Sequence, residues 1–168
     1  MNSTLLSNIF RFILLLAVQI VIFNNMTFLG FIMPLPYLLF IILYPVNGNK
    51  SGLLLASFSL GLIMDIFLNS GGIHATACLI LAYVRPSIFK FSFGISYEYQ
   101  TIKLNDVLTP ERFSFILLSV VSHHFILFLL EAFQISFFWD ILIRALLSAV
   151  FTIISCIIII YLIKPNKR

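Results

Sequence analysis

The residues that could do chemistry in this chain are few, and they lie inside strongly apolar sequence. One carboxylate, Asp65, follows Ser57 and Gly61 at intervals of four residues. Residues at this spacing share one face of a helix, so the three form a strip. Small residues on such a strip let a neighbouring helix approach closely, and a carboxylate that faces hydrocarbon is costly. We therefore expect Asp65 to point into a helical bundle.

A second polar group lies in the last third of the chain. Asp140 and Arg144 are one helical turn apart, which predicts that they pair with each other. Steps of four residues continue from Arg144 to Cys156 through small or polar residues, and this row is expected to face neighbouring helices. Glu131 is expected at about the same depth in the membrane as Asp140 and Arg144. Packing is the favoured role for these charges, and ligand or partner binding is the alternative, because charges inside a membrane are often functional.

Three further polar side chains lie in apolar surroundings. His123 and His124 are adjacent, so on a helix they point about 100° apart and do not easily bind one metal ion. Hydrogen-bonded core histidines are therefore favoured over a metal site or a proton relay. Gln19 is expected to hydrogen-bond across helices.

The sequence offers no signature of a catalyst. It contains no glycine-rich phosphate loop, no His-Glu-x-x-His and no Gly-x-Ser-x-Gly motif. Cys78 and Cys156 lack the flanking Cys or His residues of a metal site and are expected to pack. We predict no cofactor, no metal and no enzymatic activity, with an intramembrane enzyme as the least favoured alternative.

Composition predicts an all-α membrane protein. The chain of 168 residues is 61% hydrophobic and only 10% charged, more apolar than a soluble domain of this size can bury. A transmembrane barrel would instead show short alternating segments. The net charge of +4 does not indicate nucleic-acid binding, because the basic residues gather at the ends of the apolar runs.

The apolar runs predict six transmembrane helices in a single domain covering residues 1–168. The expected spans are about 5–23, 31–46, 51–68, 73–91, 113–133 and 137–163. Pro34, Pro36 and Pro45 are interpreted as boundaries of the second helix. Thr109 followed by Pro110 predicts the start of the fifth helix.

The distribution of basic residues predicts the orientation. The turns after the first, third and fifth spans contain no Lys or Arg. The positive-inside rule then places these turns outside and both termini in the cytoplasm, with Arg144 as the exception. The basic residues on the cytoplasmic side are Arg11, Lys50, Arg85, Lys90, Lys103, Arg112, Lys164, Lys167 and Arg168.

The chain resembles the MreD family, a small membrane subunit of the bacterial rod-shape machinery. The resemblance extends over nearly the whole chain in length and span order, and its specific part is confined to residues 52–83. The matching pieces are Gln19, Pro36 before a span that ends Leu43-Tyr44, Gly61-Leu-Ile-Met-Asp65, Gly72-Ile-His74, Ala82-Tyr83 and Glu131.

The resemblance implies a non-enzymatic scaffold in the bacterial plasma membrane. Members of the family bind the bitopic protein MreC, work with other elongation-complex membrane proteins, and help couple the MreB filament to peptidoglycan synthesis. The family is similar in fold to the substrate-binding subunits of energy-coupling factor transporters, so a vitamin-uptake subunit is the alternative function. By this analogy, a pocket near Asp65, Glu131, Asp140 and Arg144 is expected to hold a segment of the partner.

Overall fold

Five long helices make up most of the structure. The computed structural model describes residues 3–27, 30, 32–94, 108–133 and 135–163, and the long elements within them are all helical. The helices are α1 (Ser3–Val21), α3 (Lys50–Leu68), α4 (Ile73–Phe93), α5 (Pro110–Ala132) and α6 (Phe138–Ile163). Each is long and apolar enough to cross a membrane. The chain is therefore an all-helical, multi-pass membrane protein.

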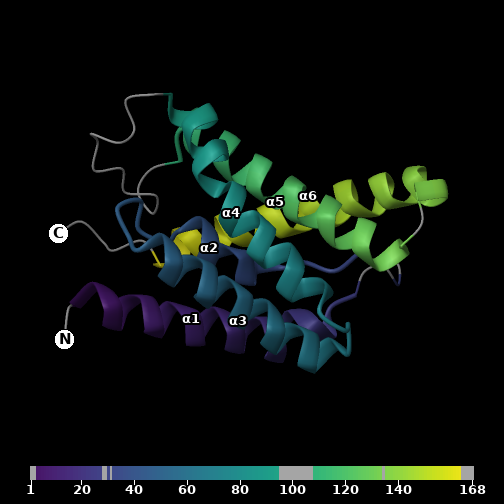
Figure 1. Cartoon of the computed structure of the whole chain (residues 1–168), viewed down its shortest axis with the longest axis horizontal. Coiled ribbons are helices and arrows are strands. Elements are labelled where there is room, and N and C mark those ends of the chain that lie inside the picture. Colours follow the sequence, from purple (N-terminus) through teal and green to yellow (C-terminus); the bar gives the residue numbers. More distant parts are fainter. Residues whose placement is uncertain (1–2, 28–29, 31, 95–107, 134, 164–168) are drawn as a thin grey trace.

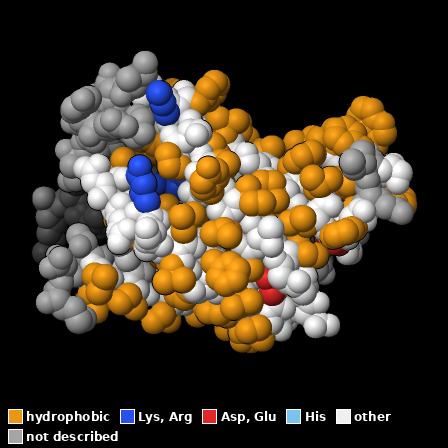
Figure 2. Space-filling view, in the orientation of Figure 1, with side chains coloured by type: hydrophobic (Ala, Val, Ile, Leu, Met, Phe, Trp, Pro, Cys, Tyr) orange, Lys and Arg blue, Asp and Glu red, His pale blue; other side chains and the backbone are white. Residues whose placement is uncertain are grey.

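The long helices run along a common direction (Figure 1). The end of the bundle at which α1 begins and α6 ends also holds Lys50, Lys90 and Arg112, and we call it the basic end. The α3–α4 and α5–α6 turns lie at the opposite end, which we call the hairpin end. Figure 2 shows the visible Lys and Arg side chains gathered towards the basic end, beside a largely apolar surface.

The second crossing differs from the expected helix over residues 31–46. Its helical part is limited to a 3-10 turn, η2 (Pro36–Leu38), and one turn of α-helix, α2 (Leu39–Ile42). Pro34 and Pro36 explain the difference, because proline lacks the backbone N–H that continues a helix. Extended chain rises about 3.3 Å per residue against about 1.5 Å in a helix, so this short run still returns the chain to the basic end (Figure 1). The expectation of six helices is thus wrong for this segment.

Side chains from α1 and α6 stabilise the non-helical backbone of this crossing. The Gln19 amide nitrogen donates to the Pro34 carbonyl at 3.2 Å, and its oxygen accepts from the Tyr37 N–H at 3.4 Å. The Leu35 N–H donates to the Thr152 hydroxyl at 3.0 Å. Irregular backbone at membrane depth is tolerated only where its polar groups are satisfied inside the protein. Gln19 and Thr152 therefore replace the backbone hydrogen bonds that a regular helix would form within itself.

Two arginines satisfy the carbonyl end of the same segment. Arg11 Nη1 donates to the Leu43 carbonyl at 2.9 Å. Arg85 Nη2 donates to the Ile42 carbonyl at 3.2 Å and also to the carbonyl of Tyr44. The last carbonyls of a helix have no partner within that helix, and here α1 and α4 provide one. Residues 34–43 are all buried, so these carbonyl groups need partners inside the protein.

The other elements follow the sequence closely. Thr109 caps α5 by accepting from the Arg112 N–H at 3.4 Å, and Pro110 stands in the first turn. The fourth helix continues through Pro86 as far as Phe93. Residues 95–107, between α4 and α5 in the sequence, lie outside the described residues.

Candidate functional site

The turn between α3 and α4 is closed by Asp65. Its carboxylate oxygens accept from the N–H groups of His74, at 2.9 Å, and Ala75, at 2.8 Å. The Ser70 hydroxyl donates to the same carboxylate at 2.6 Å. Gly72, the residue before α4, has φ 99° and provides no side-chain cap. Asp65, only 6% exposed, therefore caps the N-terminus of the next helix and complements its dipole.

The strip that leads to Asp65 packs directly on α4. A Cβ atom at Gly61 would lie 2.4 Å from the His74 carbonyl oxygen and 2.5 Å from the Ala75 Cα. Such distances leave no room for any side chain, so the two helix backbones meet at this glycine. Ser57 is fully buried one turn earlier. The inward orientation expected for the strip is confirmed.

Tyr37, which the sequence analysis did not single out, lies at the centre of a buried polar cluster. Its hydroxyl is 2.9 Å from His74 Nδ1, 3.3 Å from His123 Nε2 and 3.7 Å from the Cys78 sulfur. All four residues are buried. The cluster joins the second crossing to α4 and α5. Tyr37 is one of two tyrosines in the apolar run 31–46, and its residue type alone does not indicate its hydrogen-bond partners.

His124 points to a different neighbour. Its Nε2 lies 2.8 Å from the Thr152 hydroxyl on α6. Both histidines are thus hydrogen-bonded core residues, as favoured from the sequence. Within the described parts of the chain, no group of three His, Cys, Asp or Glu residues is arranged to hold a metal ion.

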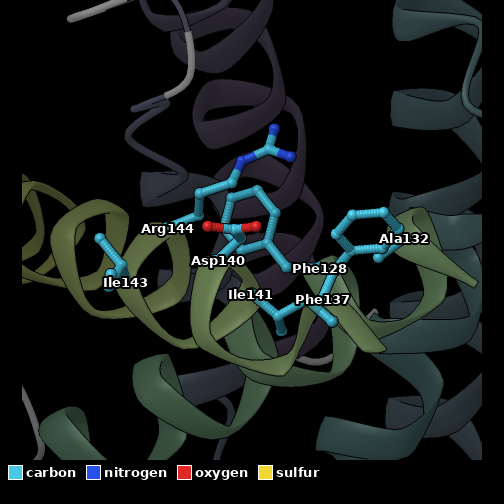
Figure 3. Close-up of a pocket in the computed structure, with 7 residues that line it drawn as sticks. All are labelled: Phe128, Ala132, Phe137, Asp140, Ile141, Ile143 and Arg144. Atoms are coloured by element: carbon cyan, nitrogen blue, oxygen red, sulfur yellow. The ribbon is translucent and has the colours of Figure 1, made fainter. Parts of the chain in front are cut away.

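The hairpin end of α5 and α6 is built differently. Arg144 Nη2 donates to Glu131 at 3.1 Å, and both side chains are partly exposed. The Arg144 guanidinium also lies 4.9 Å from the centre of the Phe128 ring. The expected pairing of Arg144 with Asp140 is wrong, because Arg144 reaches across to α5. Figure 3 shows its guanidinium directed away from the Asp140 carboxylate.

A cavity of about 580 Å³ opens beside this ion pair. Its lining is mostly apolar, with Asp140 and Arg144 as the charged groups (Figure 3). The lining residues are Phe128, Ala132, Phe137, Asp140, Ile141, Ile143 and Arg144. Asp140 is exposed and makes no ion pair with a described residue, so its carboxylate is available to a partner.

A second cavity, of about 270 Å³, adjoins the first through Phe128 and Arg144. It extends inward to His74 and to Met33 and Leu35 of the second crossing. The two cavities together connect the α5–α6 hairpin with the buried core.

The tip of the α5–α6 hairpin carries exposed aromatic side chains. Phe133 is 88% exposed and Trp139 72% exposed. In Figure 1 this hairpin extends beyond the ends of α1 and α3, and Figure 2 shows an apolar knob there. The charged cavity thus lies beside an apolar surface suited to membrane or protein contact.

The structure divides the predicted site residues into two sets. Gln19, Ser57, Gly61, Gly72 and Asp65 serve packing, capping or the turn, as described above. The cavity-lining set comprises His74, Glu131, Asp140 and Arg144. Phe128 lines both cavities and was missed, since one phenylalanine among nineteen gives no signal.

Comparison of the chain with protein-family models, with curated proteins and with solved structures finds no match.

Proposed function

We propose that this protein is a non-enzymatic scaffold subunit of a bacterial cell-elongation complex, an MreD-like protein of the plasma membrane. It binds an MreC-like bitopic protein and helps couple the MreB cytoskeleton to peptidoglycan synthesis. In this proposal the basic end faces the cytoplasm and the hairpin end faces outward. The proposal rests on the sequence resemblance and on the geometry of the hairpin end.

The observation that carries the proposal is the open cavity at the α5–α6 hairpin. Its lining is apolar, which suits a hydrophobic helix or extended segment of another membrane protein. Asp140 adds to that lining one exposed carboxylate that forms no ion pair with a described residue. A partner segment with a basic or hydrogen-bond-donating side chain at this level satisfies the carboxylate while its apolar side covers Phe137 and Ile143.

Depletion of the protein in a rod-shaped bacterium tests the function. We expect the cells to round up, and we expect the tagged protein to co-purify with a bitopic membrane protein. Re-expression of the wild-type chain should restore rods and serves as the control. Cells that keep their rod shape after full depletion would contradict the proposal.

The second candidate is a substrate-binding subunit of a vitamin-uptake transporter. The smaller cavity is the observation that favours it, because that cavity reaches the buried His74 and is lined by residues from several elements. A thermal-shift screen of the purified protein against vitamins separates the two functions, since a ligand stabilises the form that it binds. Stabilisation by one vitamin, rising with its concentration, would favour the transporter function.

A further inference from the structure

The basic end contains a third cavity, of about 730 Å³, which is larger than either cavity at the hairpin end. It lies between the turn that joins α2 to α3, the start of α3 and the second half of α4. Much of the lining is apolar, including Val46, Leu53 and Leu54, but Lys50 and Arg85 are also part of it. The cavity therefore combines two cations with an apolar wall.

Arg85 is a buried cation without a described counter-ion. The residue is only 5% exposed, and no described carboxylate forms an ion pair with it. The aromatic rings of Phe89 and Phe115 lie 5.9 Å and 5.8 Å from its guanidinium carbon. Cation–π contacts of this kind offset only part of the cost of burying a charge.

The hydrogen bonds of Arg85 leave donors available. Both of its bonds to described residues come from Nη2, which holds the carbonyls of Ile42 and Tyr44. Among the described residues, Nε is buried without a partner and Nη1 donates to no acceptor. A planar guanidinium with unused donors in a cavity is suited to an anionic oxygen, above all that of a phosphate.

We propose that this cavity binds the headgroup of an anionic phospholipid, with Arg85 and Lys50 contacting the phosphate and the apolar wall contacting an acyl chain. Lys50 is exposed at the first position of α3 and supplies the second charge. Tyr83, 76% exposed on α4, also lines the cavity, so the cavity reaches the surface of a helix that is long and apolar enough to cross a membrane. An opening at such a surface favours a lipid over a soluble anion. The proposal is independent of the proposed scaffold function.

Lipid binding to the purified protein tests the proposal. Native mass spectrometry is used to compare phosphatidylglycerol with phosphatidylcholine. We expect preferential retention of phosphatidylglycerol, and we expect Lys50→Gln to weaken it about fivefold, the factor that corresponds to about 1 kcal/mol per basic residue near an anionic surface. Lys50 is exposed at the surface, so this variant is expected to fold.

Lys90→Gln is the matched control, because Lys90 is exposed near the same end on α4 but does not line the cavity. It should leave binding of phosphatidylglycerol unchanged. An equal loss in both lysine variants, or equal retention of the two lipids, would overturn the proposal. Full displacement of the lipid by inorganic phosphate would identify a soluble-anion site and would also overturn it. Glu98 and Asp106 lie outside the described residues. If the wild type shows no preference for phosphatidylglycerol and a variant with both residues neutralised binds it more strongly, the chain itself occupies the cavity, and the proposal is overturned.

Discussion

The two hairpins of the bundle, α3–α4 and α5–α6, both carry acidic side chains, but these side chains have different roles. At the α3–α4 turn, the Asp65 carboxylate is buried and accepts three hydrogen bonds from the next helix and its turn. At the α5–α6 turn, the Glu131–Arg144 pair is partly exposed, and Asp140 lines a cavity without an ion pair to any described residue. The Asp65 carboxylate stabilises the fold, whereas the Asp140 carboxylate remains accessible.

The difference shows why a charge inside a membrane is not by itself a binding site. Gly61 lets the backbones of α3 and α4 meet, so Asp65 can reach the first N–H groups of α4. At the α5–α6 hairpin there is instead a cavity, lined in part by Phe128 and Phe137. Local packing therefore decides whether a polar group stabilises the fold or remains accessible at a cavity.

The largest effect is expected for Gly61→Leu. Its side chain would overlap the backbone of His74 and Ala75, and overpacking of this kind costs at least about 1–3 kcal/mol. We expect a severe loss of the protein from the membrane fraction, measured by quantitative immunoblotting.

Ser57→Ala is the control for the same strip. The buried Ser57 hydroxyl has no hydrogen-bond partner among the described residues, so its removal is expected to be nearly neutral. Equal accumulation of both variants would show that the strip does not contact α4 as described.

The next largest effect is expected for Asp65→Asn. An asparagine directs an NH₂ group at one of the two N–H donors of α4, so a charge-assisted bond is lost and a donor is left unpaired. The expected destabilisation is about 1–3 kcal/mol, measured as a lower Tm of the purified protein. A Tm equal to that of the wild type would contradict the capping role.

A smaller effect is expected for the Glu131–Arg144 pair. Exposed ion pairs contribute about 0–1 kcal/mol. A double-mutant cycle with Glu131→Gln and Arg144→Gln should therefore give a coupling free energy in that range. A coupling as large as the Asp65→Asn effect would remove the contrast between the two hairpins.

The smallest effect on stability is expected for Asp140→Asn. The exposed carboxylate makes no ion pair with a described residue, so the free energy of unfolding should remain within about 0.5 kcal/mol of the wild-type value. Co-purification of the bitopic partner should fall in the same variant. Unchanged co-purification would place the partner elsewhere.

The sequence predicted the long helices well because hydropathy and span length depend on local composition. Bounds such as 51–68 and 137–163 agree with α3 and α6 to within a residue. The prediction of a helix over 31–46 is wrong, although this apolar run has the composition of a membrane-spanning helix. Its actual form depends on hydrogen bonds from Gln19 and Thr152, which are distant in sequence.

The polar residues were easier to locate than to pair. The spacing of Ser57, Gly61 and Asp65 was enough to predict burial, but the backbone acceptor role of Asp65 depends on the tight turn that brings α4 back to α3. The spacing of Asp140 and Arg144 predicted an ion pair between them, but Arg144 pairs with Glu131 instead. Spacing along one helix cannot show a partner on the next.

Site-specific photo-cross-linking in growing rod-shaped cells tests the central claim most directly. A cross-linking residue at position 143 lines the α5–α6 cavity, and one at position 66 lies on the exposed face of α3. We predict an adduct with a bitopic membrane protein from position 143 and none from position 66. An adduct of equal yield from both positions, or none from position 143, would contradict the claim that the α5–α6 hairpin receives the partner.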